Sequence, residues 1–119
     1  MSRELADHIC DMLFPLGPVT ARGMFGGFGI YLDGVMFGLI ADEVLYFKAD
    51  EHSKAPYEAA GMAPFKPWEH KPMVMPYWEV PADVLDEPEQ LRGWARAAFD
   101  TALRTRKPKV KTRPGRPIS

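Results

Sequence analysis

The residues with the plainest capacity for chemistry are cations at the C-terminal end of this 119-residue chain. From position 104 to the end there are seven Lys and Arg and no Asp or Glu: Arg104, Arg106, Lys107, Lys109, Lys111, Arg113 and Arg116. Residues 1–103 carry 8 Lys and Arg against 16 Asp and Glu, so a body of formal charge −8 precedes a segment of +7. Because Lys and Arg neutralise phosphates without regard to base sequence, this segment predicts contact with nucleic acid or with an acidic protein surface.

The basic segment contains several prolines and no apolar periodicity, which predicts a disordered arm over residues 104–119. Its Gly115-Arg116-Pro117 piece partly resembles an AT-hook, whose arginine enters the narrow minor groove of A·T-rich DNA. Pro114 stands where that motif has its first arginine. Three interpretations therefore stay open: an AT-hook, loose contact with the nucleic-acid backbone, and a solubilising tail.

Other residue types that could form a site have the wrong spacing for one. The four glycines between positions 23 and 29 precede a predicted strand, whereas a phosphate-binding loop must lead into a helix, so turn formation explains them better. His8, His52 and His70 lack helical metal-site spacing, and Cys10 has no second cysteine beside it. Cys10 and His8 are two residues apart on a predicted helix and point to different faces. We therefore predict no catalytic residues, no metal and no cofactor.

A second candidate site is an aromatic, proline-rich region that contains Phe65, Trp68, Tyr77 and Trp78. Aromatic side chains of this kind either complete a core or anchor a protein interface. The composition of the same region is typical of an exposed sheet edge, which could pair with another chain. Both interpretations remain open, and these four residues are the candidates for partner binding.

The elements that must position these residues follow from periodicity and turn residues. We expect a helix at 3–14 and then a β-meander over 19–48. A short helix should follow at 54–60, capped by Ser53 and ended by Gly61. After it we expect an edge hairpin over 63–80 with its better strand at Met73–Val80, a loop between Pro81 and Pro88, and a last helix from Leu91 to about Arg106. The meander should turn at Gly26-Gly27, Asp33-Gly34 and Asp42-Glu43, with the run Val35–Ala41 central because it is apolar on both faces.

This order predicts an α+β fold of two layers. A four-strand antiparallel meander plus an edge hairpin forms the sheet, and the N- and C-terminal helices pack on one face of it. The chain has 46% hydrophobic and 26% charged residues, which suits one domain, assigned to residues 1–103. A single cysteine, no long apolar run and an acidic N-terminus favour a cytoplasmic protein with no membrane contact.

Several stretches resemble the N-terminal domain of the TfoX/Sxy family over roughly residues 3–103. They are Arg22–Tyr31, Gly34–Asp42, Leu45–Lys48, Gly61–Phe65, Met75–Pro81 and Leu91–Ala98. The resemblance implies a regulatory protein without catalytic residues. Proteins of this family act as co-activators of natural-competence genes together with the cyclic-AMP receptor protein.

Full-length competence regulators of this family carry a second, helical C-terminal domain, whereas this sequence continues only into the basic segment. We therefore expect a stand-alone regulatory module whose body docks on a protein partner, while the arm contacts DNA and replaces some contact of the second domain. The alternative is a homodimeric protein-interaction module that uses the aromatic edge and does not contact DNA. A small-molecule or enzymatic role is the third hypothesis.

Overall fold

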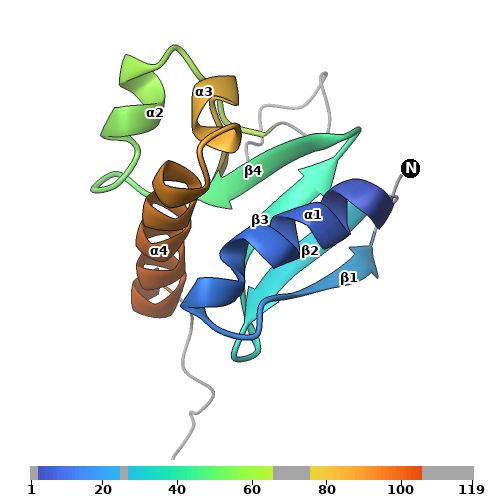
Figure 1. The fold of residues 1–119 in the computed structure, drawn as a ribbon. Helices are drawn as coiled ribbons and strands as arrows, with labels where there is room; N and C mark the ends of the chain where they lie inside the picture. Colours follow the sequence, from blue (N-terminus) through green and yellow to red (C-terminus); the bar gives the residue numbers. More distant parts are fainter. Residues whose placement is uncertain (1–2, 25–26, 66–75, 106–119) are drawn as a thin grey trace, which may run out of the picture.

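The computed structural model describes residues 3–24, 27–65 and 76–105 (Figure 1). Its elements in chain order are α1 (Arg3–Leu13), the 3-10 turn η1 (Phe14–Leu16), β1 (Thr20–Met24), β2 (Gly27–Leu32), β3 (Val35–Ala41), β4 (Val44–Lys48), α2 (Ala55–Ala59), β5 (Tyr77–Glu79), α3 (Ala82–Leu85) and α4 (Pro88–Thr105). The five strands form one antiparallel sheet in the order β1-β2-β3-β4-β5, which confirms the predicted meander with Val35–Ala41 at its centre.

Both terminal helices cover the same face of this sheet, as predicted (Figure 1). α1 lies over β1 and β2, α4 lies over β3 and β4, and the two helices contact each other. The side chains they bury include the largest of the core: Phe37, Phe47, Ile9, Leu13, Ile30, Ile40, Leu45 and Leu91. Arg92 of α4 donates a hydrogen bond of 3.1 Å to the carbonyl oxygen of Met12, and so satisfies a carbonyl near the end of α1.

A β-bulge at Phe37 adapts the central strand to this core. Ile30 pairs with Gly38 and Tyr31 pairs with Met36, so Phe37 is the extra residue on β3. The bulge turns the Phe37 ring toward the helices, where its centroid lies 6.0 Å from those of Phe47 and Phe99. The apolar run of β3 predicted its central place in the sheet, but not this irregularity.

The turns of the meander confirm two of the three predicted positions. Asp33, Gly34, Asp42 and Glu43 all have positive φ angles, as the two-residue turns that match sheet twist require. The prediction of a turn at Gly26-Gly27 is wrong at Gly27, because Gly27 already belongs to β2 and pairs with Met24. The physical reason is space: a Cβ atom at Gly27 would overlap the carbonyl oxygen of Ile40, so this strand position requires glycine.

Two further predictions are corrected. Ser53 does not cap α2, because the residue before that helix is Lys54, which makes no side-chain capping bond. The segment between Pro81 and Pro88 is not only a loop, since it includes the short helix α3. Gly61, with a φ of 78°, does end the α2 region as expected, and Met62 N–H donates to the carbonyl of Tyr57.

The predicted edge hairpin over 63–80 is present in part. β5 spans only Tyr77–Glu79 of the expected strand Met73–Val80, and its residues 73–75 lie outside the described ranges. Residues 63–65 lie along the outer side of β5: Phe65 N–H donates to the carbonyl of Tyr77 at 2.7 Å, and Glu79 N–H donates to the carbonyl of Ala63 at 3.2 Å. The β5 side of the sheet is therefore shielded by the chain itself.

Candidate protein-binding and nucleic-acid-binding surfaces

The aromatic residues proposed for partner binding are divided between the two faces of the sheet. Tyr77 and Trp78 are neighbours in β5, so their side chains alternate across it. Trp78 pairs with Phe47 on the helix-covered face, whereas Tyr77 pairs with Lys48 on the other face. Phe65 lies with Tyr77 on the face without helices, and Trp68 lies outside the described residues. The candidates that the structure describes therefore do not form a single cluster.

Trp78 belongs to an aromatic cluster beneath α2. The Tyr57 ring lies 6.3 Å from that of Trp78 and 4.8 Å, edge-on, from that of Trp94, measured between centroids. Tyr57 is buried, and this burial raises the pKa of its hydroxyl well above the ordinary value. The cluster attaches α2 to the start of α4, so half-buried Trp78 contributes to packing inside the domain.

The side chains that point away from α1 and α4 form the helix-free face of the sheet. From β1 to β5 its larger members are Arg22, Tyr31, Met36, Leu39, Tyr46, Lys48, Tyr77 and Glu79. Leu39 and Tyr77 are buried even here, at 8% and 7% exposure. The Phe65 ring lies 4.9 Å from that of Tyr46. This face combines apolar and aromatic side chains with two cations, Arg22 and Lys48, and the carboxylate of Glu79, and its members come from all five strands.

Two cations on the helix-free face are held over tyrosine rings. The Arg22 guanidinium lies 5.1 Å from the Tyr31 ring, and Lys48 Nζ lies 5.3 Å from the Tyr77 ring. Burial raises the pKa of Tyr77, and nearby Tyr31 adds to that rise. Among the described ranges, Arg22 and Lys48 take part in no salt bridge, although acidic residues outnumber basic ones in the body. Sequence reasoning did not single out either cation, but the alternation of β1 and β4 could have placed both on one face.

Arg104, predicted as the first cation of the basic arm, lies within α4 and contacts the body. Its guanidinium donates a 2.8 Å hydrogen bond to Asp50 Oδ2, across 54 residues of sequence. Asp50 Oδ1 accepts hydrogen bonds from the N–H groups of His52 and Ser53 and from Ser53 Oγ. Thr101 of α4 donates to Ser53 Oγ at 3.1 Å. Asp100, four residues before Arg104 on α4, pairs with Arg96 and not with Arg104 in the described part of the helix.

This network should make the free energy of unfolding of the domain depend on pH in the acidic range. Burial raises the pKa of Asp50, but the hydrogen bonds from Arg104, Ser53 and His52 outweigh it and lower the pKa to about 2. Because the pKa falls on folding, the Asp50 contribution to stability is fully present above the ordinary value of 3.8 and is lost as pH falls toward 2.

We expect Asp50→Asn to lower the free energy of unfolding at pH 7 by about 1–2 kcal/mol, and to flatten the pH dependence of that free energy below pH 5. Urea unfolding at several pH values checks this, with exposed Asp83→Asn as the matched control. An Asp50→Asn curve parallel to that of the control would contradict the assignment.

The other six cations of the basic arm lie outside the described residues: Arg106, Lys107, Lys109, Lys111, Arg113 and Arg116. The last described residue before them is Thr105, at the end of α4, whose Oγ1 donates to the carbonyl of Thr101. Arg104 lies within α4 and pairs with Asp50, so six of the seven cations follow the helix, with a charge of +6.

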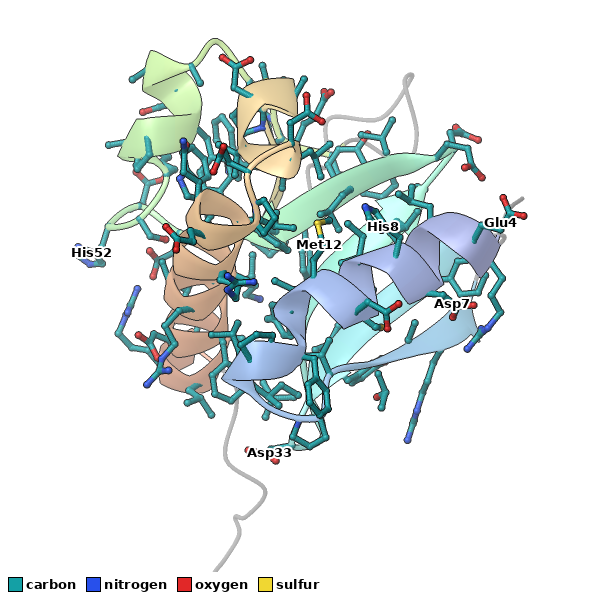
Figure 2. The ribbon with its side chains drawn as sticks, in the orientation of Figure 1. Glu4, Asp7, His8, Met12, Asp33 and His52 are labelled. Atoms are coloured by element: carbon teal, nitrogen blue, oxygen red, sulfur yellow. The ribbon has the colours of Figure 1, made fainter. Side chains whose placement is uncertain are left out.

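The histidines and the cysteine do not converge. Figure 2 shows His8 on α1 and His52 beyond β4 well apart, both exposed, while His70 lies outside the described ranges. No group of three or more metal-binding side chains occurs among the residues that the structure describes. Cys10 is half-buried, and desolvation, followed by the charge of Asp7, raises the pKa of its thiol. Those changes disfavour the reactive thiolate.

These observations define a small α+β domain built around a helix-covered antiparallel sheet. The model of the TfoX N-terminal domain matches residues 11–102, which is most of the chain, and the chain belongs to this family. It is a regulatory family with no known catalytic activity. The comparison with curated proteins gave no match. In the part of the chain that was placed, no helix combines the length and the hydrophobicity needed to cross a bilayer.

Proposed function

We propose that the protein is a regulatory binding module with two separate contact regions. Its folded body docks on a protein partner, and the six cations beyond α4 contact the DNA backbone. The observation that carries the proposal is the division of charge, −8 in residues 1–103 and +7 from Arg104 onward. An acidic body repels DNA, so phosphate contact falls to the segment that follows α4.

Family membership supports the regulatory part of the proposal. By resemblance to the TfoX/Sxy co-activators, the partner is a transcription regulator such as the cyclic-AMP receptor protein. The body offers a surface for such a partner in the helix-free face, where apolar and aromatic side chains lie beside Arg22 and Lys48. Aromatic residues and arginine are the side chains that most often anchor protein interfaces.

The test of DNA contact compares the full chain with a full-length variant whose six cations after Thr105 are replaced by Gln. A truncation would be better placed after Thr105 than after Leu103, because cutting earlier removes the Arg104–Asp50 pair and with it part of the folded body. We expect fluorescence anisotropy with a mixed-sequence duplex at low salt to show at least about tenfold weaker binding by the neutralised variant.

The matched control replaces two cations of the body, Arg3 and Arg96, each exposed and paired with an aspartate four residues on. It should bind DNA like the unmodified chain. Equal binding by the neutralised variant would overturn the assignment of DNA contact to the basic segment. A preference for an A·T-rich duplex would add minor-groove insertion by Arg116 to the proposal.

A further inference from the structure

β1 is the exposed edge of the sheet. It pairs with β2 on one side, and no described residue pairs with its other side, whereas β5 is covered by residues 63–65. An uncovered edge strand presents free N–H and C=O groups that can pair with another chain. The sequence suggested the edge near Trp68 and Trp78 for this purpose, but the folded chain leaves the opposite edge open.

The register of the first hairpin identifies which groups of β1 point outward. Met24 pairs with Gly27 across a two-residue connection, and Arg22 pairs with Gly29 two positions further on. In an antiparallel ladder, pairs that exchange both hydrogen bonds alternate with pairs that exchange none, and the pair closing a two-residue connection exchanges both. Arg22 and Met24 therefore bond to β2, and the N–H and C=O groups of Ala21 and Gly23 point away from the sheet.

The side chain at the centre of this edge is a cation without a carboxylate partner in the described ranges. Arg22 is exposed and rests over Tyr31 at 5.1 Å. A Cβ atom at Gly23 would meet nothing within 4 Å, so a side chain at this position has room on its face of the sheet. The five residues of β1 include no proline, and its register with β2 has no bulge, so among the described residues Arg22 is the charge that protects this edge.

The charge of Arg22 decides what can pair with β1. If two copies of β1 paired antiparallel through Ala21 and Gly23, each Arg22 would lie directly opposite the Arg22 of the other copy. Like charges in directly opposed positions destabilise a strand pair, so a second copy is disfavoured in that register. A strand with a carboxylate at that position gains an ion pair together with the backbone bonds.

We propose that β1 binds an extended, acidic segment of the partner protein as a sixth antiparallel strand, with a carboxylate opposite Arg22. The inference deepens the proposed function and rests on its claim that the body docks on a protein. It names the recognition mode, which is strand addition at Ala21 and Gly23, and the partner chemistry, which is a glutamate or aspartate at one fixed register.

The experiment uses the isotopically labelled full chain and two acetylated peptides, one alternating threonine and glutamate and one alternating threonine and lysine. We expect the acidic peptide to shift the amide resonances of Ala21 and Gly23 and to protect them from hydrogen exchange, with several-fold tighter binding than the basic peptide. Arg22→Glu should reverse the preference. Lys48→Glu is the matched control, since it removes the other tyrosine-bound cation of the same face from an inner strand, and it should keep the preference.

The proposal is overturned if Lys48→Glu weakens the acidic peptide as much as Arg22→Glu does, if the amide changes avoid β1, or if sedimentation shows a dimer that Arg22→Glu alters. A second variant, Gly23→Pro, removes an outward N–H and should abolish binding of both peptides. If Gly23→Pro does not fold, Arg22→Glu still decides the question. Arg22→Glu, Lys48→Glu and Gly23→Pro all keep the basic segment, so each variant should still bind DNA. Loss of DNA binding would count against the proposed function and not against strand addition.

Discussion

Phe37→Ala is expected to lower the free energy of unfolding by about 3–5 kcal/mol. Phe37 is fully buried, and its ring contacts Phe47 on β4 and Phe99 on α4. Removing the ring leaves a cavity where the bulge joins the sheet to the C-terminal helix, and the backbone around a bulge is already constrained. A domain of this size has about 5–15 kcal/mol in total, so the variant should lose a large fraction of its stability.

Phe14→Ala provides the matched control, because the same side chain at position 14 is 69% exposed in η1. Chemical denaturation with circular dichroism measures both variants, and Phe14→Ala should change the free energy of unfolding by less than about 0.5 kcal/mol. Similar losses for the two variants would mean that the core is not organised around Phe37.

Gly27→Ala should destabilise the domain by about 2–3 kcal/mol, the cost of forcing a methyl group into occupied space. A Cβ atom at Gly27 overlaps the carbonyl oxygen of Ile40 on β3, and that neighbour is backbone that cannot rotate away. To make room, β2 must move away from β3. That movement weakens the ladder that connects β1 to the rest of the sheet.

Gly23→Ala is the control for this change, since it lies four residues earlier on β1 and its Cβ position is open. Alanine there should be neutral or stabilising by up to about 1 kcal/mol, because it restricts the unfolded chain. Thermal unfolding of the pair should separate their midpoints by about 10 °C or more. Equal midpoints would show that the close approach of Gly27 to β3 is not maintained in solution.

Local sequence signals were sufficient for much of the fold. The spacing of the apolar residues of α4 predicted the face that packs on the core, because helix periodicity is a property of one segment. These residues are Leu91, Ala95, Ala98 and Ala102, which are buried, and Trp94 and Phe99, which are partly buried. Asp33-Gly34 predicted its turn for the same reason, since both residues accept positive φ. The alternation of side chains along a strand also places Tyr77 and Trp78 on opposite faces, so strand periodicity alone is enough to divide the proposed aromatic site.

What the sequence did not predict depends on contacts between distant segments. The Arg104–Asp50 pair joins residues 54 positions apart, so a chain pattern could only suggest the nearer Asp100. The bulge at Phe37 and the requirement for glycine at position 27 both follow from the register of β2 against β3. Arg22 matters because β1 is the open edge of the sheet, and that depends on the order of all five strands. In each case the outcome depends on a residue or strand that is distant in sequence, and the periodicity of one segment does not identify it.

The central claim is that phosphate contact belongs to the segment after α4 and partner docking to the body. The most direct measurement is the salt dependence of duplex binding by the full chain and by the variant with its six distal cations neutralised. Each phosphate contact contributes about 0.9 to the magnitude of the slope of log K against log salt, so contact by all six cations should give the full chain a slope of about −5. The neutralised variant should show a slope near zero. A neutralised variant that keeps both the affinity and the slope of the full chain would contradict the claim and move DNA contact onto the body.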